Sequence, residues 1–112
     1  MVEQVEIKAA LRGILSRHEG HGQAVTAREL AGTLGSNDRA VRLAIAELIR
    51  EGLPVLSATD NPPGYFIASS RAEWADYDAQ LKSRIVEDAK RKRDVKVAVA
   101  RYFAPAVQEK LL

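Results

Sequence analysis

The chain has 112 residues, of which 46% are hydrophobic and 29% are charged. This balance is typical of one globular domain with a modest core. The sequence contains no cysteine, which excludes disulfides, thiolate metal sites and cysteine nucleophiles. The start of the chain lacks the apolar core of a signal peptide, and no stretch is long and apolar enough to span a bilayer. We therefore expect a cytoplasmic protein that makes no membrane contact.

The net charge of +2 is unevenly distributed. Residues 1–70 carry 7 lysines and arginines against 8 aspartates and glutamates, whereas residues 71–112 carry 10 against 7. A polyanionic partner would therefore be attracted chiefly by the C-terminal part and by local arginine clusters.

Hydrophobic spacing predicts a first helix over residues 3–18. Thr26 and Glu29 then have the spacing of a capping box, in which each side chain bonds the backbone amide of the other residue. This box starts a second helix, which runs to about Leu34. Gly35 follows as the left-handed residue that commonly closes a helix.

Asn37 is a favourable N-cap for a third helix, which runs to Glu51 and is closed by Gly52. Its apolar residues recur every three or four positions, so we expect a wide inward stripe made of Val41, Ala44, Ile45, Leu48 and Ile49. The segments "LPVLSA" and "GYFIA" are rich in strand-forming residues, and "TDNPP" separates them. These segments predict a hairpin with a proline-stiffened tip.

A second capping box, Ser70 with Glu73, precedes a long segment with one apolar face. The basic run "KRKR" interrupts this face at Lys90, Arg91, Lys92 and Arg93. The helix either continues through the run as a solvated turn or breaks into two helices, and the sequence leaves both open. The following "VKVAVARYF" favours helix over strand, and Pro105 ends it.

The order "LGSNDRAVRLAIAELIREG" followed by "LPVLSATDNPPGYFI" resembles the N-terminal DNA-binding domain of the biotin operon repressor family and related winged helix-turn-helix regulators. The similarity covers about residues 5–68. The later segment resembles, more weakly, the helical extensions of small phage-type winged-helix proteins. The resemblance implies that the third helix enters the major groove of DNA while the second crosses the phosphate backbone.

The expected inward stripe leaves Arg39 and Arg42 on the outer side of the third helix, one turn apart. Arginine pairs bidentately with guanine, so these two are the expected base readers. Asp38 is an unusual residue beside phosphate and has the spacing to pair with Arg42. Asn37 can act as a helix cap or as an adenine contact, but not easily as both. Arg28, in the first turn of the second helix, is expected to reach phosphate.

The remaining predicted DNA contacts lie in loops and in the tail. We include Ser36 in the turn and Asn61 in the wing, although a wing without lysine or arginine makes a weak contact. The basic run at residues 90–93 would add salt-dependent affinity without sequence preference. Its alternative interpretation is a solvated helix turn.

The predicted fold is mainly α with a small β-hairpin wing (α+β): a winged helix-turn-helix domain over residues 1–69 and a C-terminal helical extension over residues 70–112. The expected function is non-enzymatic binding of double-stranded DNA by a homodimer paired through the C-terminal helix, in transcription or in phage or plasmid replication. No residue grouping indicates a metal, a cofactor or catalysis. The alternatives are a winged-helix module that docks proteins without DNA and a tail that binds single-stranded nucleic acid.

Overall fold

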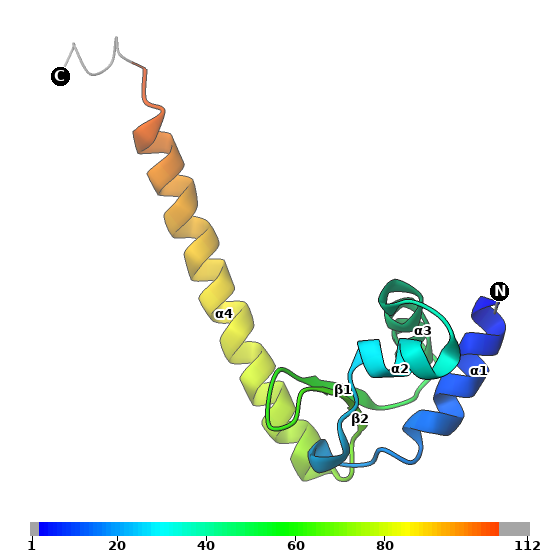
Figure 1. The fold of residues 1–112 in the computed structure, drawn as a ribbon. Helices are drawn as coiled ribbons and strands as arrows, with labels where there is room; N and C mark the ends of the chain where they lie inside the picture. The colour runs from blue at the N-terminus through cyan, green and yellow to red at the C-terminus, as the bar shows by residue number, and fades with distance from the viewer. Residues whose placement is uncertain (1–2, 106–112) are drawn as a thin grey trace. The chain divides into compact units, whose positions relative to one another are not determined.

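The computed structural model describes residues 3–105 and is mainly helical, with a small antiparallel hairpin and a long C-terminal helix (Figure 1). This coarse architecture agrees with the sequence prediction. The last part of the predicted C-terminal extension, residues 106–112, lies outside the described residues. The elements in chain order are α1 (Gln4–Leu15), the short 3-10 helix η1 (His21–Gln23), α2 (Ala27–Leu34), α3 (Asp38–Arg50), β1 (Val55–Ala58), β2 (Gly64–Ile67) and α4 (Arg71–Tyr102). Between residues 3 and 105, no helix is long and apolar enough to cross a membrane.

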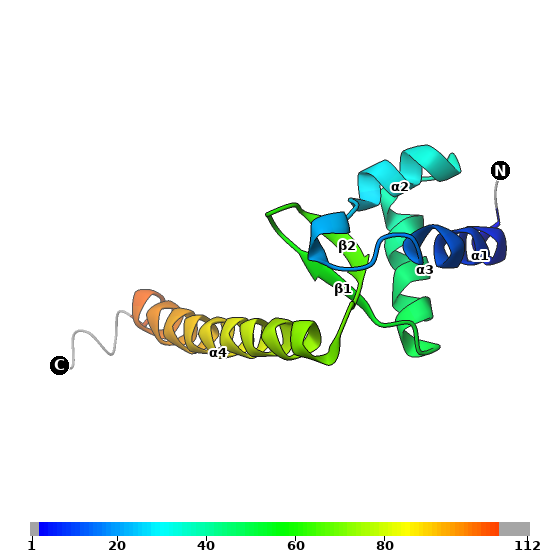
Figure 2. The ribbon, with the colours of Figure 1, turned by 90° about the horizontal axis from the view of Figure 1, so that it is seen from below.

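The core lies where α3 packs against α1 and α2 (Figure 2). Each of these helices has apolar residues at helical spacing, so each can bury one stripe while its polar face stays in water. The fully buried large side chains are Leu11, Leu15, Leu30, Val41 and Leu48. Burial of its apolar stripe sets the rotation of α3 about its own axis and therefore determines which of its residues face outward.

Two details of the predicted helices are wrong. Ile49 is 48% exposed and not inward, because it lies about 80° around the helix axis from Val41, at the edge of the buried stripe. The first helix ends at Leu15, not at residue 18. Beyond it, the amides of Arg17 and His18 bond the carbonyls three residues earlier, which tightens the chain out of the α-helix.

The hairpin pairs Val55 with Ile67 and Ala58 with Gly64. Its second strand is also covered on the other edge. The amide of Val25 donates to the carbonyl of Tyr65 at 2.9 Å, and the amide of Tyr65 donates to the carbonyl of Val25 at 2.7 Å. These bonds join the hairpin to the residue that leads into α2.

The chain divides into two compact units, the first ending at Ala75 and the second beginning at Asp76. Helix α4 spans this boundary and runs without a break through the basic residues 90–93, which resolves the alternatives that the sequence left open. None of its described residues is buried. An unbroken helix forms here because residues 71–102 contain neither proline nor glycine.

The predicted capping box at the start of α4 forms only in part. The Ser70 hydroxyl accepts from the amide of Glu73 at 3.1 Å, as expected. The Glu73 carboxylate instead accepts from the amides of Ser69 at 2.8 Å and His21 at 3.0 Å. Tertiary packing brings η1 within reach, so this carboxylate bonds across the fold.

Candidate nucleic-acid interface

The turn between α2 and α3 is held by local hydrogen bonds. Gly35 adopts left-handed backbone angles, φ 62° and ψ 39°, and the amide of Ser36 donates to the carbonyl of Ala31 at 2.9 Å. The Asn37 side-chain oxygen accepts from the amide of Ala40 at 2.9 Å. Asn37 therefore acts as the N-cap, and this use of its oxygen competes with reading adenine, which needs both the oxygen and the amino group. Ser36 is half-buried beside it.

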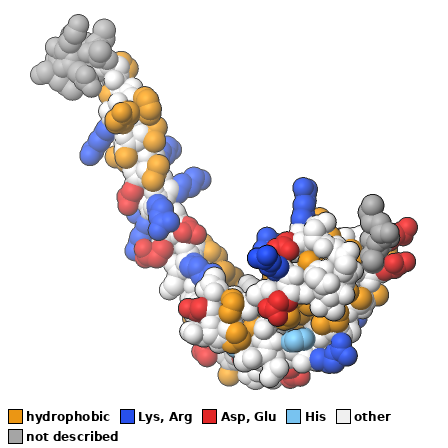
Figure 3. Space-filling model, viewed as in Figure 1, with side chains coloured by type: hydrophobic (Ala, Val, Ile, Leu, Met, Phe, Trp, Pro, Cys, Tyr) orange, Lys and Arg blue, Asp and Glu red, His pale blue; other side chains and the backbone are white. Residues whose placement is uncertain are grey.

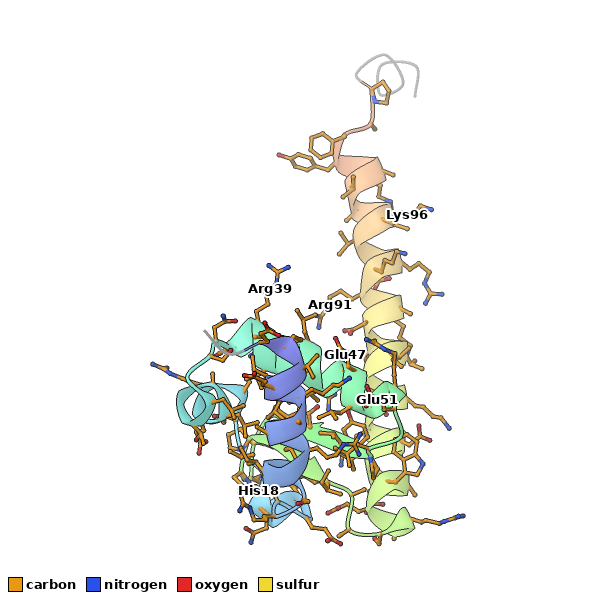
Figure 4. All side chains as sticks on the ribbon, turned by 90° about the vertical axis from the view of Figure 1, so that its right-hand side faces the viewer. His18, Arg39, Glu47, Glu51, Arg91 and Lys96 are labelled. Carbon is orange, nitrogen blue, oxygen red and sulfur yellow. The ribbon has the colours of Figure 1, made fainter. Side chains whose placement is uncertain are left out.

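Arg39 and Arg42 lie on the exposed side of α3, opposite the buried stripe. Figure 4 shows the Arg39 side chain extending away from the neighbouring helices. Among the described residues, no ion pair within 4.0 Å involves either arginine, and the expected pairing of Asp38 with Arg42 does not form. Both guanidinium groups are thus available to a ligand from outside.

Two acidic residues at the C-terminal end of α3 are paired with α1: Glu47 lies in the helix and Glu51 is its C-cap. Lys8 approaches Glu51 at 2.5 Å and Glu47 at 3.5 Å, and Arg12 approaches Glu51 at 3.3 Å. The hydrogen bond between Lys8 and Glu51 raises the pKa of the lysine and lowers the pKa of the carboxylate. These contacts offset the negative charges of Glu47 and Glu51, so the exposed arginines near the start of α3 face less competition from these two carboxylates.

Arg28 is exposed in the first turn of α2, as the sequence predicted. The capping box at this helix start forms: the Thr26 hydroxyl accepts from the amide of Glu29, and the Glu29 carboxylate accepts from the amide of Thr26 at 3.4 Å. This carboxylate lies at the positive end of the helix dipole. It therefore competes with any anion that approaches Arg28.

The hairpin tip contains Asn61, which is exposed and has a positive φ of 63°. The carbonyls on either side of it, those of Asp60 and Pro62, accept from the His21 ring nitrogen Nε2 at 2.9 and 3.1 Å. The same ring stacks on buried Phe66, with centroids 5.2 Å apart. His21 thus holds the tip in place and presents Asn61 outward.

Sequence reasoning missed the roles of His21 and Glu73. No motif in the sequence singles out His21, and its partners at the hairpin tip are 39 and 41 residues away along the chain. Burial alone would raise the pKa of Glu73, but hydrogen bonds from the amides of Ser69 and His21 outweigh it and lower the pKa. No local motif signals contacts across such separations.

The basic residues Lys90, Arg91, Lys92 and Arg93 are all exposed on α4. Consecutive residues are rotated by about 100° in a helix, so these four side chains spread around most of its circumference. Lys90 also approaches Glu87 at 3.5 Å. A single flat or grooved partner can therefore contact only part of this run.

Within residues 3–105, no three histidine, aspartate or glutamate side chains are grouped so that they could hold a metal ion. The predicted DNA contacts that the structure leaves exposed include Arg39 and Arg42 at the start of α3, Arg28 at the start of α2, Asn61 at the hairpin tip and residues 90–93 on α4. No protein-family model, curated protein or solved structure matches the chain.

Proposed function

We propose that the protein is a winged helix-turn-helix protein that binds double-stranded DNA in a sequence-specific manner. In this proposal α3 is the recognition helix and enters the major groove, α2 crosses the backbone, and the hairpin is the wing. Regulation of transcription is the favoured setting, with an accessory role in phage or plasmid replication as the second.

The observation that carries the proposal is the pair Arg39 and Arg42 at the start of α3. Both are exposed, neither has an ion-pair partner among the described residues, and the opposite side of α3 is buried. They are separated by about 4.5 Å along the helix axis and about 60° around it. Two guanidinium groups placed in this way can reach neighbouring base pairs in one groove, where arginine recognises guanine O6 and N7.

The other contacts have supporting roles. Arg28 would bind a backbone phosphate and set the register of α3 without reading sequence. The wing would contribute little, because its tip carries Asp60 and no lysine or arginine. In a homodimer paired through α4, two copies of α3 would read half-sites about one helical turn apart.

The test is a gel-shift series with random duplex and single-stranded DNA pools, performed at two salt concentrations. We expect the unmodified protein to select duplex sequences, and Arg39→Ala with Arg42→Ala to weaken that binding by roughly thirtyfold or more, since each bidentate contact contributes about 1–3 kcal/mol. The matched control is Arg17→Ala with Arg71→Ala, which removes the same charge from exposed positions outside α2 and α3. Equal binding by the two double variants would overturn the proposal.

The second candidate is a winged-helix module that docks another protein. It is favoured by two apolar side chains exposed on α3, Leu43 at 53% and Ile49 at 48%, and by the net negative charge of residues 1–70. The two functions differ in their response to salt. DNA binding weakens steeply as salt rises, whereas an apolar docking surface is nearly insensitive to it.

A further inference from the structure

Helix α4 carries exposed apolar side chains along its length. Ile85 is 60% exposed, Val95 53%, Val99 50% and Tyr102 82%. Figure 3 shows that apolar side chains gather on the C-terminal part of α4, with charged side chains around its middle. Several exposed apolar side chains on one helix are typical of a surface that pairs with another helix.

Most of these exposed apolar residues, together with the partly buried Leu81, follow a seven-residue repeat, whereas the exposed Val86, Val97 and Phe103 lie off it. Two positions of this repeat form the seam of a two-stranded coiled coil. One position is held by residues 78, 85, 92 and 99, and the other by residues 74, 81, 88, 95 and 102. The residues on this seam are Trp74, Asp78, Leu81, Ile85, Asp88, Lys92, Val95, Val99 and Tyr102. From 78 to 102 the seam spans about three and a half repeats and about 36 Å, which is long enough for such pairing.

The seam is nearly symmetric about Lys90. When a second, antiparallel copy is placed with a two-fold axis at this residue, the two types of seam position face each other. Leu81 then faces Val99 of the second copy, and Ile85 faces Val95. The two charged residues near the centre also match, because Asp88 faces Lys92.

The outer end of the seam is also compatible with this register. Asp78 faces Tyr102 of the second copy, whose hydroxyl can donate to the carboxylate while its ring covers the seam. Each of these pairs occurs twice because of the two-fold axis.

Other arrangements of the same seam are worse. In a parallel pair in register, Asp88 faces Asp88 and Lys92 faces Lys92, which places like charges in contact. Sliding the antiparallel pair by one repeat puts Lys92 against Leu81 or against Val95. Buried charges without partners are costly, so the charged residues select one register and orientation.

We propose that two copies of this chain pair through α4 as an antiparallel coiled coil centred on Lys90, with reciprocal Asp88–Lys92 contacts at its middle. This inference deepens the homodimer in the proposed function and rests on it for its biological role. Its test uses protein without DNA, so that a failure of DNA binding and a failure of this pairing are separate results.

The flanks of the seam predict how salt affects the pairing. Lys82, Arg84, Arg91 and Lys96 occupy the positions beside it, and Figure 4 shows Arg91 and Lys96 leaving α4 on different sides. In the antiparallel pair Lys82 lies near Lys96 of the second copy. Lys82 also approaches Asp78 of its own helix at 3.2 Å, which offsets part of this repulsion. Salt screens the remaining repulsion more than it screens the Asp88–Lys92 contacts, because the dimer buries those contacts. The dimer therefore becomes tighter as salt rises, which is opposite to the behaviour of DNA binding.

The orientation is tested by cysteine cross-linking of the full chain, which has no cysteine of its own. Ile85→Cys and Val95→Cys are made separately, with a mass tag on one, and oxidised alone or mixed. We expect the mixed sample to form the tagged–untagged cross-link and neither variant to cross-link with itself. In the proposed pair, residue 85 of one copy and residue 85 of the other lie about 15 Å apart along the axis, and the same holds for residue 95. Self-cross-linking of Ile85→Cys would establish a parallel pair and overturn the proposal.

The seam itself is tested by sedimentation with a matched pair of variants. Val95→Asn on the seam is expected to raise the dissociation constant of the dimer by about a hundredfold, since it removes two buried valines per dimer. The control is Val97→Asn, because Val97 lies off the seam and has a similar exposure of 45%. This variant is expected to leave the dissociation constant unchanged. Circular dichroism verifies that both variants keep their helix content.

The central charges are tested in the same assay. Asp88→Lys and Lys92→Asp are each expected to weaken the dimer, and the double variant is expected to restore it, because the exchanged charges again face opposite partners. A monomeric unmodified protein at high micromolar concentration, or a double variant weaker than both single variants, would overturn the proposal.

Discussion

Replacing Gly64 with alanine is expected to destabilise the first compact unit strongly. A Cβ atom at this position would lie 2.3 Å from the carbonyl carbon of Val25, 2.4 Å from its oxygen and 2.7 Å from the nitrogen of Thr26. All three are backbone atoms, so no side-chain rotation relieves the clash. Gly64 also has a φ of +125°, a backbone angle that residues other than glycine rarely adopt.

The magnitude follows from two costs. An unfavourable backbone conformation costs about 1–3 kcal/mol, and forcing extra volume into a packed site costs about 1–3 kcal/mol. Together they predict a loss of roughly 2–6 kcal/mol in the free energy of unfolding. A unit of this size has a total stability of only about 4–11 kcal/mol, so the variant would lose a large part of it.

The measurement is urea unfolding followed by circular dichroism, with Gly13→Ala as the control. Gly13 lies within α1, and a Cβ there meets no atom within 4 Å, so alanine should stabilise the protein by about 0.5–1 kcal/mol. The reasoning is refuted if Gly64→Ala unfolds within about 0.5 kcal/mol of the unmodified protein. In that case the close approach of β2 to Val25 does not constrain the fold.

Three further outcomes are expected. Glu73→Gln should reduce the loss of stability at acidic pH. The pKa of Glu73 is lowered in the fold, so its ionised form stabilises the fold above the ordinary carboxyl pKa of 4.5, and this contribution is lost as pH falls through the lower folded pKa. Urea titrations at several pH values measure this effect, and an unchanged loss of stability at acidic pH would contradict it. Asn37→Ala should cost about 0.5–2 kcal/mol through loss of the α3 cap, and a cost near zero in the same assay would show that the cap is dispensable. His21→Ala should speed amide hydrogen exchange at the hairpin tip by on the order of tenfold, whereas unchanged exchange would mean that another contact holds the tip.

The short-range parts of the fold could be predicted from the sequence. The Thr26–Glu29 capping box, the left-handed Gly35 and the Asn37 cap all form, because each joins residues that are neighbours along the chain. The four inward residues Val41, Ala44, Ile45 and Leu48 are likewise buried. The exposure of Arg39 and Arg42 follows from this stripe, so the centre of the candidate site was also predictable.

Other parts of the site depend on contacts that no local pattern encodes. The sequence could not show that His21 holds the hairpin tip, that Glu73 caps the amide of His21, or that α1 pairs with the acidic residues of α3. The hydrogen bonds and ion pairs in these contacts join residues about 39 to 52 positions apart.

The amino-acid sequence by itself determined the order of the helices and the hairpin, the caps of α2 and α3 and which side of α3 faces outward, because caps, turns and hydrophobic spacing act within a few residues. Only the tertiary structure decided which polar groups bond across the fold and that Ile49 remains exposed at the edge of the buried stripe. Those outcomes depend on which elements pack together, and hydrogen bonds between distant residues form only after packing has brought them within reach.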